Sequence, residues 1–165
     1  MQKRLMTVAC LMTLLGSVSL VADQIVVEKK VLTLAAARRI VAAAEAEARA
    51  RGVGVVIVVV DDAGHVIELA RMDDAQVASV NVGIGKARTA AIYRRPTRVF
   101  EEQIKNGRIA ALALADATPL QGGLPIVFDG HVVGAVGVSG DTPQVDEEIA
   151  MAGMLAVKNQ PTEVK

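Results

Sequence analysis

Two histidines are the residues of this chain whose chemistry is most informative. His65 follows a short turn-forming segment, and His131 directly follows a second one, which predicts an exposed position. An imidazole could ligate haem iron or another metal, with Met72 or Tyr93 as a second ligand. The competing interpretation is that His65 is a solvated polar residue at the start of a strand. Two histidines without a thiolate do not make a convincing zinc set.

Neither of two glycine-containing segments carries a catalytic signature. Gly83-Ile84-Gly85-Lys86 has the wrong spacing for a phosphate-binding loop and lies within a helical pattern, although Lys86 and Arg88 could still pair with a carboxylate. Ser139 lacks the glycine spacing of a nucleophile elbow. The chain therefore offers no recognisable catalytic serine or nucleotide site.

Three short acidic or basic groups have ordinary explanations. Asp61 and Asp62 could bind a cation or act as acids, but aspartates in turns usually accept hydrogen bonds from their own backbone. Arg71, Asp73 and Asp74 are most simply the solvated end of a strand. These groups add no catalytic signature.

The first 22 residues have the pattern of a secretory signal. Lys3 and Arg4 form a basic start, Leu5–Leu15 is an apolar core too short to span a bilayer, and small residues follow. We expect cleavage after Ala22, with a cut after Ser19 as the alternative. Cys10 lies inside the apolar core, which argues against a lipoprotein signal.

Removal of this segment restricts the function classes that remain. It takes away two basic residues and no acidic one, so the mature chain has 16 basic and 18 acidic residues and a formal charge of −2. A near-neutral surface gives no electrostatic footprint for nucleic acid or an anionic membrane. We also expect no stable membrane insertion. The single cysteine leaves with the signal, which excludes a disulfide framework, a cysteine nucleophile and a thiolate metal site.

The segment Leu124–Asp141 is the strongest structural signal in the chain. Asp129-Gly130 stands between two apolar runs, and this pair is typical of a type I′ hairpin turn. Glycines recur at positions 130, 134, 137 and 140. Repeated glycine in a strand indicates close approach by another backbone, a neighbouring subunit or a flat ligand.

The remaining pattern predicts a single α+β domain with helices packed on an antiparallel sheet. Thr33 is a good N-cap and Gly52 a good C-terminal stop for a helix between them. The continuous β-branched run 53–60 predicts a central strand buried on both faces. The other expected elements are a strand at 65–71, helices at 76–94 and 97–105, a strand or irregular segment within 108–123, and a last helix opened by Thr142 and Pro143.

An ordered set of short motifs resembles one known family over about residues 31–158. The motifs are Asp61-Asp62-Ala63-Gly64-His65, Arg71-Met72-Asp73, Gly85-Lys86-Ala87-Arg88-Thr89-Ala90, Arg95-Pro96-Thr97, Gly122-Gly123-Leu124-Pro125-Ile126 and Val133–Gly140. Together they resemble the GlcG/HbpS-type haem-binding family, whose domain also forms the C-terminal part of PduO-type corrinoid proteins.

The resemblance implies a profilin-like α+β domain that assembles into homo-oligomers and binds haem. It implies that His65 is the axial ligand of the iron, and that Lys86 and Arg88 pair with the haem propionates or with another acidic ligand. It also implies that four glycines form close walls of the pocket, namely Gly122, Gly123, Gly134 and Gly137.

These expectations combine into one function and two alternatives. The chain is expected to comprise a signal peptide (1–22), a leader (23–30), the domain (31–158) and a tail (159–165). We expect a secreted or periplasmic, non-catalytic haem-binding protein in haem sensing or iron handling. The alternatives are an accessory protein or enzyme that binds a small carboxylate or a corrinoid in the same pocket, and a structural or signalling oligomer without a ligand.

Overall fold

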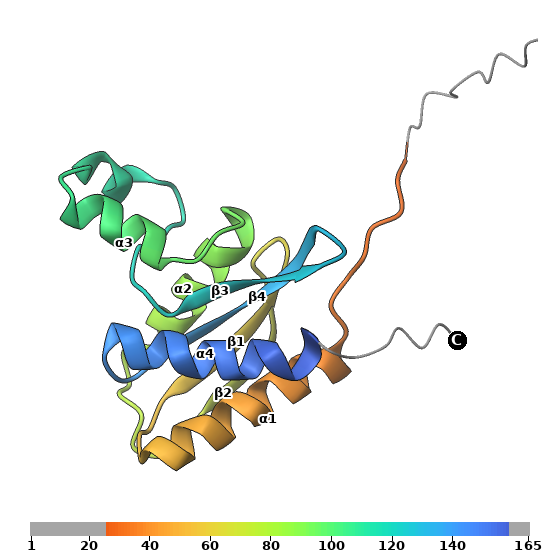
Figure 1. Ribbon diagram of the computed structural model, residues 1–165, viewed down its shortest axis with the longest axis vertical. Helices are drawn as coiled ribbons and strands as arrows, with labels where there is room; N and C mark the ends of the chain where they lie inside the picture. The colour runs from red at the N-terminus through yellow and green to blue at the C-terminus, as the bar shows by residue number, and fades with distance from the viewer. Residues whose placement is uncertain (1–25, 159–165) are drawn as a thin grey trace, which may run out of the picture.

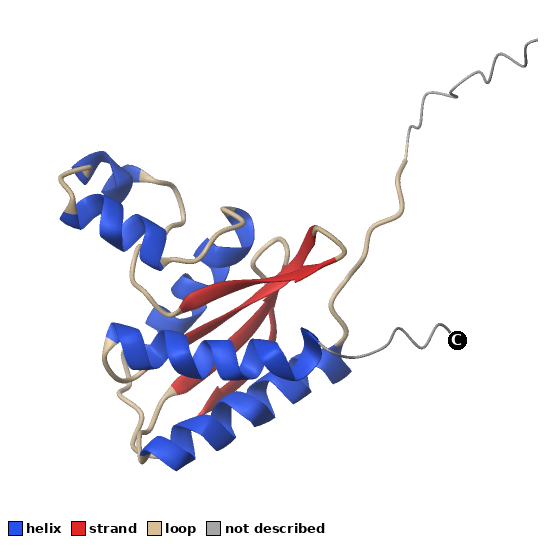
Figure 2. Ribbon diagram, viewed as in Figure 1, coloured by secondary structure: helices blue, strands red, loops and turns tan. Residues whose placement is uncertain are grey.

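The computed structural model describes residues 26–158, which form one α+β domain around a four-stranded antiparallel sheet. The strand order is β2-β1-β4-β3, and Figure 2 shows the sheet between helices. The elements in chain order are α1 (Leu34–Arg51), β1 (Val56–Asp61), β2 (Val66–Arg71), α2 (Ser79–Ile92), α3 (Arg98–Lys105), a 3-10 helix η1 (Ile109–Ala113), β3 (Gly123–Phe128), β4 (His131–Ser139) and α4 (Pro143–Lys158).

The prediction of a central, doubly buried strand is confirmed by β1. It pairs with β2 on one side and β4 on the other, and its five valine and isoleucine side chains are all buried. Successive side chains of β1 point to opposite faces of the sheet and therefore enter two separate cores. This arrangement explains why the sequence of β1 is continuously apolar instead of alternating.

The two faces of the sheet are covered differently (Figure 1). Helices α1 and α4 lie side by side over one face, where Ile40 and Ile149 join Ile57 in the larger core. Helix α2 alone covers the other face, where Ala87 and Ala90 pack with the valines of β1. Small residues on α2 allow its backbone to lie close to β4.

The hairpin prediction is also confirmed. Asp129 and Gly130 both have positive φ, 46° and 77° respectively, as a type I′ turn requires. The helix expected at 76–94 begins later, at Ser79, because residues before it form separate turns, including the hydrogen bond from the Ser79 N–H to the Gln76 carbonyl. Residues 109–113 form the 3-10 helix η1 instead of a strand, and α3 and η1 project together from the sheet (Figure 1).

The described part of the leader runs along one end of the sheet without forming a strand. Lys29 pairs with Asp62 in the β1–β2 turn, and Lys30 pairs with Asp129 in the β3–β4 turn. The expected signal peptide and the C-terminal tail lie outside the described residues. Among residues 26–158, no helix is both long and apolar enough to cross a bilayer.

Candidate functional site

The exposed turn between β1 and β2 holds His65 in a defined orientation. One carboxylate oxygen of Asp61, Oδ1, accepts hydrogen bonds from the N–H groups of Ala63 (2.9 Å) and His65 (2.8 Å). The other, Oδ2, lies 3.4 Å from His65 Nδ1. The imidazole is otherwise open to solvent, with 78% of the side chain exposed. The second ring nitrogen, Nε2, is therefore available to an external ligand.

The charge of Asp61 is stabilised by these contacts. Partial burial disfavours the ionised carboxylate, but hydrogen bonds from the backbone of His65 and Ala63 and from the imidazole outweigh this effect. The pKa of Asp61 consequently lies below its usual value. The turn thus presents an anionic carboxylate to one side of the imidazole.

Arg88 reaches the same turn from helix α2. Its Nε lies 3.4 Å from the Gly64 carbonyl oxygen, to which it donates. A Cβ on Gly64 would stand 2.7 Å from Arg88 Cγ, and Gly64 has a φ of 87°, so glycine is required for both space and conformation. The structure therefore brings together two of the expected site residues, His65 and Arg88.

Neither Met72 nor Tyr93 shares this turn with His65. The six residues of β2 lie between His65 and Met72, so the two are seven residue steps apart, or about 23 Å at about 3.3 Å per residue. The Tyr93 hydroxyl donates to the Ala115 carbonyl (2.7 Å) at the base of the α3–η1 projection. His131 lies at the β3–β4 turn, where its Nδ1 is 2.8 Å from the carbonyl oxygen of Asp129. Within the described residues, no group of three or more His, Cys, Asp or Glu side chains could hold a metal ion.

Lys86 lies in a different place from the one expected for a propionate partner. Its ammonium group is buried, 2.7 Å from Asp146 Oδ2 and 3.0 Å from the Val138 carbonyl oxygen. The side chains of Lys86 and Asp146 are only 4% and 3% exposed. Lys86 therefore joins α2 to the start of α4 inside the molecule, and it shares no surface with His65 and Arg88.

Burial raises the pKa of Asp146, against the opposing effect of the Lys86 ammonium group. The other carboxylate oxygen, Oδ1, accepts from the Asp141 N–H at 3.0 Å and so fixes the loop that enters α4. Asp146 stands in the first turn of α4, where an acidic side chain suits the positive end of the helix. Its role in a buried pair had no local signal, because the partner is 60 residues away in the chain.

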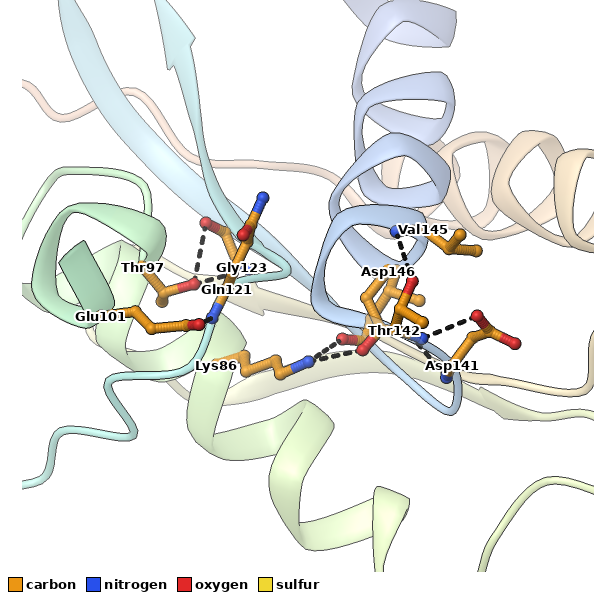
Figure 3. A network of polar contacts seen from close by, with 10 residues as sticks. Lys86, Thr97, Glu101, Gln121, Gly123, Asp141, Thr142, Val145 and Asp146 are labelled. Carbon is orange, nitrogen blue, oxygen red and sulfur yellow. Dashed lines mark hydrogen bonds and ion pairs between the residues drawn. The ribbon is translucent and has the colours of Figure 1, made fainter. Parts of the chain in front are cut away.

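Further polar contacts extend from this pair towards α3 (Figure 3). The Thr97 hydroxyl accepts from the Gly123 N–H (2.9 Å), and Glu101 Oε2 accepts from the Gln121 N–H (2.6 Å). The loop before β3 is thus tied to α3 at two points. No local pattern in the sequence marks Thr97 or Glu101 as part of a network, since each contact joins segments about 20 residues or more apart.

The glycines expected to line a pocket are covered by the protein's own atoms. A Cβ on Gly137 would stand 2.5 Å from both the Ala87 nitrogen and the Gly83 oxygen of α2. A Cβ on Gly134 would stand 2.4 Å from the Val60 oxygen, and a Cβ on Gly123 would stand 2.4 Å from the Lys86 oxygen.

Gly122 is equally confined. It combines a φ of 123° with a Cβ position 2.8 Å from the Val138 oxygen and 2.9 Å from Lys86 Nζ. Of the three kinds of neighbour that repeated glycine indicates, another backbone is the main one present at these four positions.

A shallow hollow of about 290 Å³ lies beside the start of α4, lined by Gln121, Gln144, Glu147, Glu148 and Met151. Glu147 is 15% exposed, and its Oε1 lies 3.1 Å from Arg98 Nε. Its Oε2 atom is buried without a hydrogen-bond partner. Burial raises the pKa of Glu147, although Arg98 and a hydrogen bond with the Gln121 side chain oppose the shift.

Two of these polar centres contain the charged residues that the sequence singled out. The β1–β2 turn presents an exposed imidazole and a nearby guanidinium, which suits a planar metal-containing ligand with acidic substituents. The Lys86–Asp146 centre is sealed inside the protein and has its hydrogen bonds satisfied internally. Of these two centres, the turn is the one open to solvent.

Comparisons with known proteins agree with this architecture. The family model described as "Haem degrading protein HbpS-like" matches residues 32–155. Protein GlcG of Escherichia coli strain K12 is 44% identical over 111 residues, which cover 67% of this chain and 83% of GlcG.

Two solved structures share the fold. Klebsiella pneumoniae protein ORFY has a TM-score of 0.80 at 31% identity, with 85% of this chain and 99% of that chain covered. The complex of PduOC with haem has a TM-score of 0.72 at 25% identity, with coverage of 78% and 96%. From the extent of the family match and the identity to GlcG, the chain belongs to the HbpS-like family.

Proposed function

We propose that this protein binds haem at the β1–β2 turn, through His65 as the axial ligand and Arg88 as a partner of a propionate. The observation that carries this proposal is that the Arg88 side chain donates to the carbonyl of Gly64, the residue before His65, while the imidazole remains 78% exposed. The similarity to the PduOC–haem complex supports the choice of haem as ligand.

The residues around the turn fit the chemistry of haem. Neutral imidazole is a common axial ligand of haem iron, and a guanidinium recognises carboxylates through two parallel hydrogen bonds. Exposed apolar residues are near neighbours of both residues in the chain: Val66 directly follows His65 and is 46% exposed, and the exposed Ile92 lies one helical turn after Arg88. When bound, the iron would supply a Lewis-acidic and redox-active centre.

In such a complex the protein would orient the haem and enclose part of it. A second copy of the chain would supply the further apolar cover that an exposed turn lacks, so we propose a homo-oligomer as the haem-binding form. Lys86, Gly122, Gly123, Gly134 and Gly137 would act indirectly, by fixing α2 and the sheet on which Arg88 and His65 stand.

We further propose that the protein is secreted or periplasmic and non-catalytic, in haem sensing or iron handling. The basic start and apolar core of residues 1–22 support export. A small carboxylate or a corrinoid is a weaker candidate, because Lys86 is engaged with Asp146 and so only Arg88 remains near His65.

The test is a haemin titration followed by absorbance, with the wild-type protein, His65→Ala and the matched control His131→Ala. We expect a saturable one-to-one Soret shift that is lost in His65→Ala and retained in His131→Ala. A shift unchanged in His65→Ala would place the ligand elsewhere, and the absence of a saturable shift would exclude haem binding. Addition of ascorbate to the complex distinguishes binding from degradation. We expect the Soret band to persist, whereas degradation of the haem would remove it.

A further inference from the structure

The two carboxylate oxygens of Asp61 have separate tasks. Oδ1 accepts from two backbone N–H groups and closes the turn, whereas Oδ2 lies beside His65 Nδ1 at 3.4 Å. Asp61 is also the last residue of β1, where it pairs with Gly134 of β4. The sheet therefore fixes the backbone that carries the carboxylate, and among residues 26–158 this carboxylate is the side-chain group that contacts the imidazole.

An anionic acceptor at Nδ1 determines which ring nitrogen carries the proton. A neutral imidazole has one N–H donor and one acceptor nitrogen, so a carboxylate beside Nδ1 favours the proton at Nδ1. The lone pair then lies on Nε2, which points away from Asp61. Histidine ligands of metals commonly donate their other N–H to a carboxylate, which fixes the ring and increases the basicity of the ligand.

The other charged side chains near the turn have partners of their own, and Asp61 is the one that contacts the imidazole. The adjacent Asp62 pairs with Lys29 of the leader at 2.7 Å, and Arg88 donates to the Gly64 carbonyl. Asp61 thus contacts the imidazole, while Asp62 is directed to the leader. The two adjacent aspartates provide a matched pair for an experiment, because the same change in charge can be made with and without loss of the imidazole contact.

We propose that Asp61 is a positioning residue for His65: it holds the imidazole in the Nδ1–H tautomer, presents Nε2 outward as the metal-binding atom, and makes the site favour ferric over ferrous haem. The part of this proposal that concerns haem rests on the proposed function. The part that concerns the tautomer does not require any ligand. A more basic imidazole stabilises the more highly charged iron, which is the physical reason for the ferric preference.

The first experiment measures the His65 tautomer in the ligand-free protein by ¹⁵N NMR of the side chain, at about pH 8. Asp61→Asn retains an Oδ1 acceptor for the turn but removes the charge, and Asp62→Asn is the control. We expect the Nδ1–H tautomer in the wild type and in Asp62→Asn, and its loss in Asp61→Asn. An Nε2–H tautomer in the wild type, or no change in Asp61→Asn, would overturn the positioning role.

The second experiment measures the affinities for ferric and ferrous haem and the midpoint potential of the complex. We expect Asp61→Asn to lower the ferric-to-ferrous affinity ratio by three- to tenfold, the latter corresponding to a rise of about 59 mV for a one-electron couple. Asp62→Asn should leave this ratio unchanged, and equal effects of the two variants would overturn the ferric preference. If the wild type binds no haem, the proposed function fails together with the ferric preference, while the tautomer still decides whether Asp61 positions His65.

Discussion

Lys86 and Asp146 form a buried ion pair with 2.7 Å between Nζ and Oδ2, at the point where α2, β4 and α4 meet. Each charge depends on the other, because water does not reach either side chain. The pair links α2 and α4, which pack on opposite faces of the sheet, at the end of the sheet remote from His65. Its geometry leads to the first prediction.

Removal of one partner of this pair should destabilise the fold strongly. Lys86→Met or Asp146→Leu leaves an uncompensated buried charge, for which a cost of about 3–5 kcal/mol is expected. The double variant should be less destabilised than the sum of the two single variants, by about 1–3 kcal/mol. Urea unfolding of all four proteins measures this coupling energy.

The exposed Glu45–Arg49 pair on α1 provides the control for that cycle. Its side chains lie 3.0 Å apart on a solvated face. The same double-mutant cycle there should give a coupling energy below about 1 kcal/mol. Equal coupling at the two sites would show that burial of Lys86 and Asp146 does not determine their interaction.

Arg88→Gln should weaken haemin binding about tenfold, because it removes the proposed partner of a propionate, and tenfold corresponds to about 1.4 kcal/mol. Arg38→Gln, on the exposed face of α1, is the control and should bind as the wild type does. The effect of Arg88→Gln should disappear when the dimethyl ester of haemin replaces haemin. A tenfold loss that persists with the ester would exclude a propionate contact.

Met72→Leu should leave the Soret spectrum of the haemin complex unchanged. The length of β2 places Met72 about 23 Å from His65, too far to ligate the same iron within one chain. The substitution conserves volume, so stability should change by less than about 1.5 kcal/mol. A spectral change in Met72→Leu, measured beside His65→Ala, would identify the thioether as a ligand.

Gly137→Ala should separate α2 from the sheet and destabilise the protein by about 1–3 kcal/mol or more. The added methyl group would meet the backbone of Ala87 and Gly83 at 2.5 Å, where no flexible side chain can move aside. Gly130→Asn is the contrasting substitution, since Gly130 has open space and asparagine tolerates its φ of 77°. Thermal unfolding should show a large loss only for Gly137→Ala.

Glu147→Gln should stabilise the protein near pH 7, by up to about 1 kcal/mol, because Glu147 Oε2 is buried without a partner. The pKa of Glu147 is raised in the folded state, so the folded chain binds this proton more tightly than the unfolded chain. The contribution of Glu147 to stability is therefore present below the pKa of the unfolded chain and is lost as pH rises through the folded pKa.

The advantage of Glu147→Gln over the wild type should accordingly grow between about pH 4 and pH 7. Urea unfolding at several pH values measures it, with Glu148→Gln as the control at the neighbouring, more exposed carboxylate. A constant difference across this range would contradict the raised pKa.

Local chemistry in the sequence was sufficient to predict most of the elements. The Thr33 N-cap and the left-handed Gly52 cap bound α1 as expected, and Asp129-Gly130 forms the type I′ turn. These signals act within a few residues, so they can be recognised without knowledge of the fold. The same applies to β1, whose apolar run already indicated burial on both faces.

The sequence determined the types and local order of the groups at the β1–β2 turn, including the aspartate that precedes His65. Tertiary structure decided that Arg88 joins His65, that Lys86 instead enters a buried pair with Asp146, and that backbone atoms cover the glycines of β3 and β4. Residues 86 and 88 are both basic and nearly adjacent, but they point in different directions from α2 and therefore meet different elements. The physical reason is that a side chain's solvation and charge partner depend on contacts between distant segments, which form only when the helices pack on the sheet.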